Sequence, residues 1–243
     1  HIGWYIKKNS NFEEYLKNKE IKFIGKKGSF VVFDGSQIFH RGGLIEKDKS
    51  LIKLLQSFKD KNNSIEIYNK DALSLPIWKL GSGSREVIAN LPYNISTKIL
   101  INLLKNSSQF SKLTMMFQKE VANRIIAKPG SKPYSRLSVI TQLKTKAKIL
   151  FDIPDTAFFP KPKVQSSLVQ FIPYENEKHN FDFEKMEELT RFVFAKKRKM
   201  LRTIFKKEGG SSFLNSINID PNIRPENLTL EEFCKLEFAL RKH

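Results

Sequence analysis

Between residues 44 and 172, short apolar runs alternate with longer runs in which apolar residues recur every three to four positions. Short runs of this kind are typical of buried strands, and the longer ones are typical of amphipathic helices. The pattern predicts strands at residues 44–46, 65–68, 86–89, 113–117, 147–151 and 167–172, and helices at residues 49–58, 96–105 and 118–127. This alternation favours an α/β fold with a mostly parallel, doubly wound sheet.

The pattern changes after a polar break at residues 173–176. Beyond the break only the helical period remains, and it predicts helices at residues 183–195, 199–207, 211–217 and 229–240. We therefore expect an α/β domain over residues 44–174 and a small helical domain over residues 175–243.

Residues 1–43 show a different, β-rich pattern. Residues 21–33 are typical of a strand, a turn and a second strand, Asp34-Gly35 is a tight-turn signal, and residues 37–40 predict a further strand. No strand-helix alternation accompanies these strands. We expect residues 1–43 to be a segment of other origin, joined to the rest of the chain near residues 41–44.

The run His40-Arg41-Gly42-Gly43 faintly resembles the end of a jelly-roll 2-oxoglutarate oxygenase, in which such a histidine binds iron. That chemistry needs two histidines and one carboxylate on the metal. The chain has no His-x-Asp pair, so a structural role for His40 is favoured and no metal site is predicted.

The charge of the chain predicts a polyanionic partner. Its 43 Lys and Arg residues outnumber its 25 Asp and Glu residues, which gives a formal net charge of +18. Nucleic acid is the simplest such partner, and an anionic membrane surface is the alternative, although no long apolar span is visible. With Cys234 as its single cysteine, the chain has no disulfide framework, and we expect a cytoplasmic protein. The candidate phosphate contacts are Arg136, Lys161, Lys163, Lys196, Lys197, Arg198, Lys199 and Arg202.

The stretch Asn90-Leu91-Pro92-Tyr93 lies where the strand at residues 86–89 is expected to pass into the helix at residues 96–105. The Asn90 side-chain oxygen and the Leu91 carbonyl can both accept hydrogen bonds from an amino group. Tyr93 offers a flat face on which a nucleobase can stack. An ordinary turn after a strand is the alternative interpretation.

Together with other motifs, this stretch resembles the small-subunit ribosomal RNA adenine N6,N6-dimethyltransferases over about residues 44–243. The matching segments are Ile45-Glu46-Lys47-Asp48, Asp71-Ala72-Leu73, Asn90-Leu91-Pro92-Tyr93, Phe117 to Arg124, Tyr134 to Val139 and Phe158 to Val164. The resemblance implies a catalytic turn at Asn90, Leu91, Pro92 and Tyr93, with Phe158 covering the flipped base opposite Tyr93. It also implies that S-adenosylmethionine is bound by Glu46, Asp71, Ala72 and Asn90.

One departure from the family changes the expected fold. The family opens with a strand and a Gly-rich turn that lets the backbone approach the cofactor, and neither is recognisable before Leu44. We expect a Rossmann-like methyltransferase sheet lacking this first strand and turn. The implied activity is dimethylation of two adjacent adenosines near the 3′ end of small-subunit rRNA, impaired by the missing turn. The implied partner is this rRNA in the pre-30S particle. The chain is expected to be a monomer and to have no membrane partner. The alternative is a catalytically inert rRNA-binding module that acts in ribosome assembly.

Overall fold

The computed structural model describes residues 5–6, 30–34, 72–80, 84–159, 162–176 and 179–242. The chain divides into two compact units. The first, the sheet unit, spans His1–Ala122 and Lys148–Pro173, and the second, the helical unit, spans Asn123–Ala147 and Tyr174–His243. The helical unit thus contains residues 123–147 as well as the C-terminal helices.

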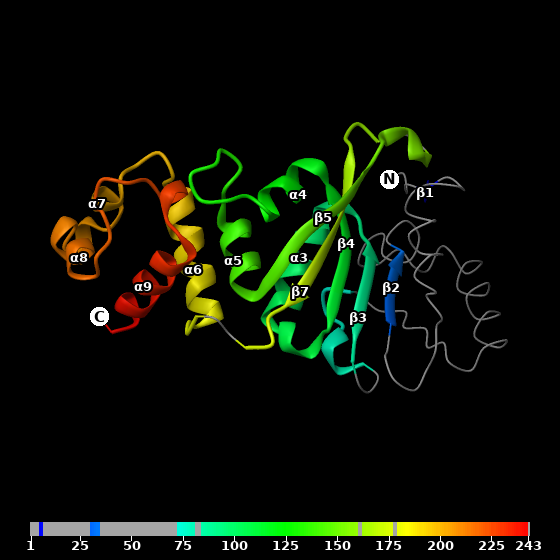
Figure 1. The fold of residues 1–243 in the computed structure, drawn as a ribbon, viewed down its shortest axis with the longest axis horizontal. Helices are drawn as coiled ribbons and strands as arrows, with labels where there is room; N and C mark the ends of the chain where they lie inside the picture. Colours follow the sequence, from blue (N-terminus) through cyan, green and yellow to red (C-terminus); the bar gives the residue numbers. More distant parts are fainter. Residues whose placement is uncertain are drawn as a thin grey trace. The chain divides into compact units, whose positions relative to one another are not determined.

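The sheet unit is built on a mixed five-stranded sheet in the order β2-β3-β4-β7-β5. β2, β3 and β4 run parallel, whereas β7 is antiparallel to β4 (Figure 1). The strands are β2 (Phe30–Asp34), β3 (Glu86–Asn90), β4 (Lys112–Gln118), β7 (Ser166–Pro173) and β5 (Thr145–Ile153). A second, two-stranded antiparallel sheet pairs β1 (Tyr5–Ile6) with β6 (Phe158–Phe159). The α/β class predicted from the sequence is confirmed.

The structure gives β2 a partner that the sequence analysis did not assign. A strand was expected at its residues, within the β-rich segment, and the structure pairs Phe30–Asp34 in parallel with β3. The register runs from Phe30 beside Glu86 to Asp34 beside Asn90. An uninterrupted apolar run such as Phe-Val-Val-Phe suits a strand in the middle of a parallel sheet as well as one in a hairpin. Periodicity alone therefore did not assign its partner.

Helix α3 (Tyr93–Lys105) leaves the end of β3 and packs along β4 (Figure 1). Its buried residues Ile99, Leu100, Leu103 and Leu104 recur at helical spacing and are no more than 1% exposed. β4 contributes Leu113 and other fully buried side chains to the same core. The short helices of this unit are η2 (Ile77–Lys79), η3 (Ser107–Gln109) and η4 (Asp155–Ala157), while α4 (Lys119–Ile125) follows β4.

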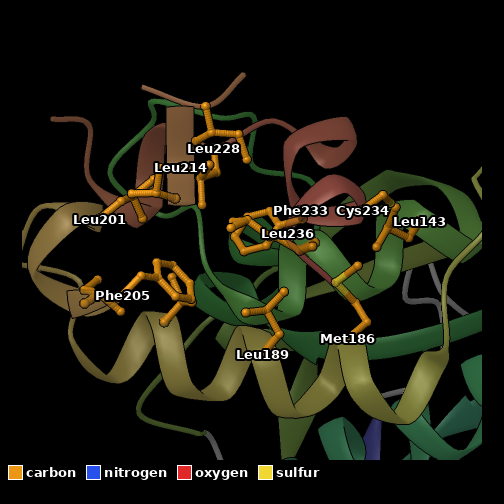
Figure 2. Packing of buried hydrophobic residues seen from close by; sticks show 14 of the residues in the cluster. Leu143, Met186, Leu189, Leu201, Phe205, Leu214, Leu228, Phe233, Cys234 and Leu236 are labelled. Carbon is orange, nitrogen blue, oxygen red and sulfur yellow. The ribbon is translucent and has the colours of Figure 1, made fainter. Parts of the chain in front are cut away.

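In the helical unit, α5, α6 and α9 pack against one another around one core. Figure 2 shows Met186 and Leu189 of α6 pointing toward Phe233 and Leu236 of α9. The helices are α5 (Arg136–Lys144), α6 (Phe183–Ala195), α7 (Leu201–Ile204), η5 (Lys206–Glu208), α8 (Ser211–Ser216), η6 (Pro225–Asn227) and α9 (Leu230–Arg241). A capping box, in which Thr229 and Glu232 bond each other's backbone amides, starts α9. Among the described helices, none is long and apolar enough to cross a membrane.

Two helices differ from the sequence-based expectation. The helix predicted at residues 199–207 is a short α7 followed by the 3-10 turn η5, because buried apolar residues extend only from Leu201 to Phe205. Gly209 and Gly210, both at positive φ, then end the segment. Conversely, α5 was not predicted, because polar residues such as Ser138 and Thr141 occupy buried positions and hide its apolar period.

Two phenylalanines of α9 provide a matched test of this core. We expect Phe233→Ala to lower the free energy of unfolding by about 3–5 kcal/mol, because Phe233 is fully buried and its removal leaves a cavity. Phe238→Ala should cost about 1 kcal/mol or less, because Phe238 is 46% exposed. Urea titration of both variants measures the difference, and similar costs would contradict this assignment of the core.

Candidate active site

The turn at Asn90–Tyr93 connects the end of β3 directly to the start of α3. Asn90 is the last residue of the strand, Tyr93 is the first of the helix, and Pro92 is the N-cap, with φ −55° and ψ 134°. Proline suits this position because it has no N–H to leave unpaired at the helix start. Asn90, Pro92 and Tyr93 are half-buried, whereas the Leu91 side chain is buried. The turn therefore holds a polar side chain at a fixed point on the sheet edge.

Two hydrogen-bond acceptors remain available in this turn. The Asn90 side chain makes no hydrogen bond to another residue that the structure describes. In the first turn of α3, the amides of Ile95 and Ser96 both donate to the Pro92 carbonyl at 3.1 Å, so the helix does not use the Leu91 carbonyl there. An amide oxygen and a backbone carbonyl thus lie one residue apart. Two such oxygens can accept the two hydrogens of an amino group.

The side chain of Tyr93 is held by packing and by one hydrogen bond. Its Oη atom lies 2.6 Å from Oγ of Ser166, the first residue of β7. Its ring packs against a buried cluster made by Met116, Ile153, Phe158 and Leu168. Burial raises the pKa of the Tyr93 phenol above its ordinary value of 10.0, and the hydrogen bond with Ser166 partly offsets this effect. Tyr93 is therefore a neutral, oriented ring beside the two acceptors.

The structure brings Phe158 into the same cluster as Tyr93. Phe158 is 1% exposed and starts β6, where it lies opposite Ile6. These two predicted site residues are 65 positions apart in the chain by their numbers, so the packing of β6 near α3 is what unites them. Of the predicted cofactor residues, Ala72 is buried in a turn, at 4% exposure. Glu46 and Asp71 lie outside the described residues, as do His40 and Lys161.

Two residues that the sequence analysis did not assign also lie at this edge. Asp34 ends β2 at the register position beside Asn90, and Ser166 begins β7 beside Gln118, the last residue of β4. The strand followed by Asp34-Gly35 was the available signal for Asp34. No signal existed for Ser166, because its partner Tyr93 is distant in sequence.

A second polar network holds the same ends of β4, β5 and β7. The Ser167 hydroxyl donates to Oδ1 of Asp152 at 2.6 Å, and Nζ of Lys119 lies 2.7 Å from Oδ2 of the same carboxylate. The hydrogen bonds from Lys119 and Ser167 lower the pKa of Asp152. No group of three or more His, Cys, Asp or Glu residues within the described ranges is placed to hold a metal ion.

Most of the predicted phosphate contacts that the structure describes lie in the helical unit. Lys196, Lys197, Arg198 and Lys199 form an exposed or half-exposed turn between α6 and α7, here called the basic turn. Nζ of Lys196 lies 3.8 Å from the centroid of the Phe192 ring. Arg202 is exposed and hydrogen-bonds Asn222.

The two remaining predicted contacts that the structure describes differ, because Arg136 is paired with an acidic side chain whereas Lys163 is exposed. Arg136 forms an ion pair with Glu187, which also pairs with Arg191 at 3.1 Å. The charge of Arg136 is therefore partly offset within the helical unit. Lys163 is exposed in the sheet unit.

The fold is a mixed α/β sheet of the Rossmann-like class in which β3 passes into α3 through the Asn-Leu-Pro-Tyr turn, and such sheets bind ligands at the carboxyl ends of their parallel strands. A family model described as ribosomal RNA adenine dimethylase matches residues 37–242, and the chain belongs to this family. The match begins within the segment that the sequence analysis assigned to another origin.

Curated relatives support the same family. A protein named ribosomal RNA small subunit methyltransferase A from Blochmanniella floridana is 39% identical over 203 residues, covering 81% of this chain and 74% of the relative. The protein of the same name from a Wolbachia species of Drosophila simulans is 43% identical over 198 residues, covering 79% and 72%. These relatives are enzymes by name.

Solved structures share the fold. A dimethyladenosine transferase from Plasmodium falciparum aligns with a TM-score of 0.74 at 23% identity, covering 100% of this chain and 98% of that one. The 23S rRNA methyltransferase ErmE aligns with a TM-score of 0.64 at 15% identity, covering 98% and 99%. At these identities the likeness shows the Rossmann-like fold.

The burial of Tyr93 predicts how it titrates. Because burial disfavours the phenolate, Tyr93 should stay neutral up to and beyond pH 10, the ordinary pKa of tyrosine. Absorbance at 295 nm, compared between the unmodified chain and Tyr93→Phe, isolates this residue. An ionisation step below pH 10 that the variant lacks would contradict the buried, hydrogen-bonded environment.

Proposed function

We propose that this chain transfers methyl groups from S-adenosylmethionine to N6 of two adjacent adenosines near the 3′ end of small-subunit ribosomal RNA. The observation that carries the proposal is the pair of free acceptors at Asn90 and Leu91, beside the fixed ring of Tyr93. The names of the curated relatives support the substrate class. The pre-30S particle is the proposed form in which the chain, as a monomer in the cytoplasm, meets this RNA.

The proposed role of the acceptors follows from the chemistry of the adenine amino group. Its nitrogen is a poor nucleophile because its lone pair is delocalised into the ring. When Asn90 Oδ1 and the Leu91 carbonyl accept the two hydrogens, the lone pair turns out of the ring plane toward the donor. These oxygens also stabilise the positive charge that develops on the nitrogen, and no general base is required.

Tyr93 and Phe158 are proposed to hold the base after it leaves its stack. Removing a base from its stack costs a few kcal/mol, and stacking on an aromatic ring offsets about 1–3 kcal/mol of that cost. Tyr93 is half-buried and so offers part of its ring. Phe158 is 1% exposed, so its proposed contact on the opposite side requires its ring to become exposed when the base enters.

The donor site is proposed at the carboxyl edge of the parallel strands, with Glu46, Asp71, Ala72 and Asn90 as its residues. When bound, S-adenosylmethionine supplies an electrophilic methyl group. The fit rests on the free side-chain amide of Asn90 and on the small, buried Ala72, because ligands of such sheets bind at the carboxyl ends of the strands.

Replacing Asn90 tests the catalytic assignment. We expect Asn90→Ala to lower the rate of methyl transfer by about 100-fold or more, because one of the two acceptors is lost. Asn102→Ala is the matched control, since Asn102 is exposed on α3 and should leave the rate unchanged. Incorporation of labelled methyl groups into unmethylated small-subunit particles gives the rates. Equal rates for Asn90→Ala and the unmodified chain would contradict the assignment.

The methyl-transfer assay, combined with a thermal-shift measurement, separates the enzyme from the alternative function, an inert rRNA-binding module for ribosome assembly. A thermal shift of several degrees with S-adenosylmethionine, together with methyl transfer, supports the enzyme. Binding to the particle without a thermal shift or transfer supports the assembly module.

The basic turn is proposed to contact phosphates, with Arg202, Arg136, Lys161 and Lys163 as further contacts. Lys197, Arg198 and Lys199 make no ion pair with another residue in the described part of the chain. Cations that are not paired within the protein bind phosphates at lower cost, and each such contact releases counterions from the RNA. RNA affinity should therefore fall steeply with salt concentration.

A pair of double variants tests this surface. We expect Lys197→Ala/Arg198→Ala to weaken RNA binding and to flatten the plot of log K against log salt, by about 0.7–0.9 for each phosphate that the protein no longer neutralises. Lys146→Ala/Lys148→Ala removes the same charge from exposed positions of β5 and should change the slope less. Filter binding at several salt concentrations measures both slopes. Equal slopes would show that net charge, not the basic turn, governs binding.

A further inference from the structure

We propose that Ser166 is a positioning residue of the active site, because its buried hydroxyl fixes the ring of Tyr93 in the orientation that holds the target base. This inference rests on the proposed function, since it concerns the ring that receives the base. Ser166 is not part of the Asn-Leu-Pro-Tyr turn, and it lies 73 residues further along the chain.

The hydrogen bond between the two side chains is short and shielded. Oγ of Ser166 and Oη of Tyr93 are 2.6 Å apart, and Ser166 is fully buried. A buried hydroxyl without a partner is costly, so rotation of the Tyr93 ring away from Ser166 is opposed. Packing against the buried cluster that contains Phe158 also restricts the movement of the Tyr93 ring. The hydrogen bond with Ser166 therefore fixes the position of the hydroxyl end of the Tyr93 ring.

Ser166 is itself held in place by the strand that carries it. It begins β7 and lies opposite Gln118 in the antiparallel ladder with β4. The ladder therefore fixes the hydroxyl of Ser166 relative to a helix that starts elsewhere in the chain.

This arrangement predicts an effect on the chemical step more than on binding. Tyr93 follows the acceptors Asn90 and Leu91 in the turn, as the first residue of α3. A change in the position of its ring therefore shifts the bound target base relative to these acceptors. A misplacement of about 1 Å costs about 100-fold in rate in well-oriented reactions. The base and the RNA around it retain their other contacts, so binding constants should change little.

A double-mutant cycle on Ser166 and Tyr93 tests the proposal, with Ser167→Ala as the matched control. Ser166→Ala should lower kcat by about 10-fold to 100-fold, with KM for S-adenosylmethionine and for the small-subunit particle within about twofold. Tyr93→Phe should lose a similar factor. The double variant should be no slower than the slower single variant, because both changes break the same bond.

The control distinguishes positioning from general destabilisation. Ser167 is as buried as Ser166 and donates a bond of the same length, but to Asp152. Ser167→Ala should lower the melting temperature about as much as Ser166→Ala does and leave kcat within about threefold of the unmodified chain. In Ser166→Ala, the ionisation of Tyr93 followed at 295 nm should also move to higher pH, since the hydrogen bond lowers the pKa of the phenol.

The outcomes separate this proposal from the proposed function. An active chain whose kcat is unchanged by Ser166→Ala, or in which the two single effects multiply, overturns the positioning role and leaves the enzyme assignment standing. Loss of kcat in Ser167→Ala equal to that in Ser166→Ala also overturns it. An unmodified chain that transfers no methyl group overturns both proposals together.

Discussion

The parallel pairing of β3 between β2 and β4 determines where every element of the candidate site lies. Val87, Ile88 and Ala89 of β3 are buried at 1%, 5% and 1% exposure, so both faces of the strand are covered. Strands of this kind use their backbone groups in the ladder and are apolar along their length. The first position free to carry polar chemistry is therefore the carboxyl end of the strand, which Asn90 occupies.

The same constraint explains the residues that follow Asn90. A helix that starts immediately after a buried strand must leave its first backbone groups satisfied or exposed. Pro92 removes one donor, and its carbonyl accepts from the amides of Ile95 and Ser96 in the first turn of α3. The Leu91 carbonyl is thereby released, so the chain geometry that starts the helix also creates the second acceptor. The backbone geometry that starts α3 is therefore also the geometry that leaves the second acceptor free.

The sequence predicted the local parts of this arrangement well. The strands predicted at residues 86–89 and 113–117 lie within one residue of β3 and β4, and the helix predicted at residues 96–105 ends with α3, which begins three residues earlier. Each has a pattern contained in a few neighbouring residues. The partner of β2 and the bond between Tyr93 and Ser166 were not predictable in this way. Both join segments far apart in the chain, where a single sequence carries no local signal.

Charge shows a similar limit, because composition predicts a polyanionic partner but not the surface that meets it. Arg136 was assigned to the RNA surface from its charge, yet its guanidinium lies against Glu187 and links α5 to α6. Glu187 accepts from Arg191 as well, so one carboxylate pairs with two guanidinium groups and offsets one of their two positive charges. A cation that is paired in this way must give up its partner before it can bind a phosphate, and the lost ion pair offsets part of the gain.

The cations of the basic turn have no such cost among the described residues, because their turn follows the last buried residues of α6 and precedes Leu201, the next buried residue. α7 begins only at Leu201, two residues later than the predicted helix, so these side chains lie together on the turn before it.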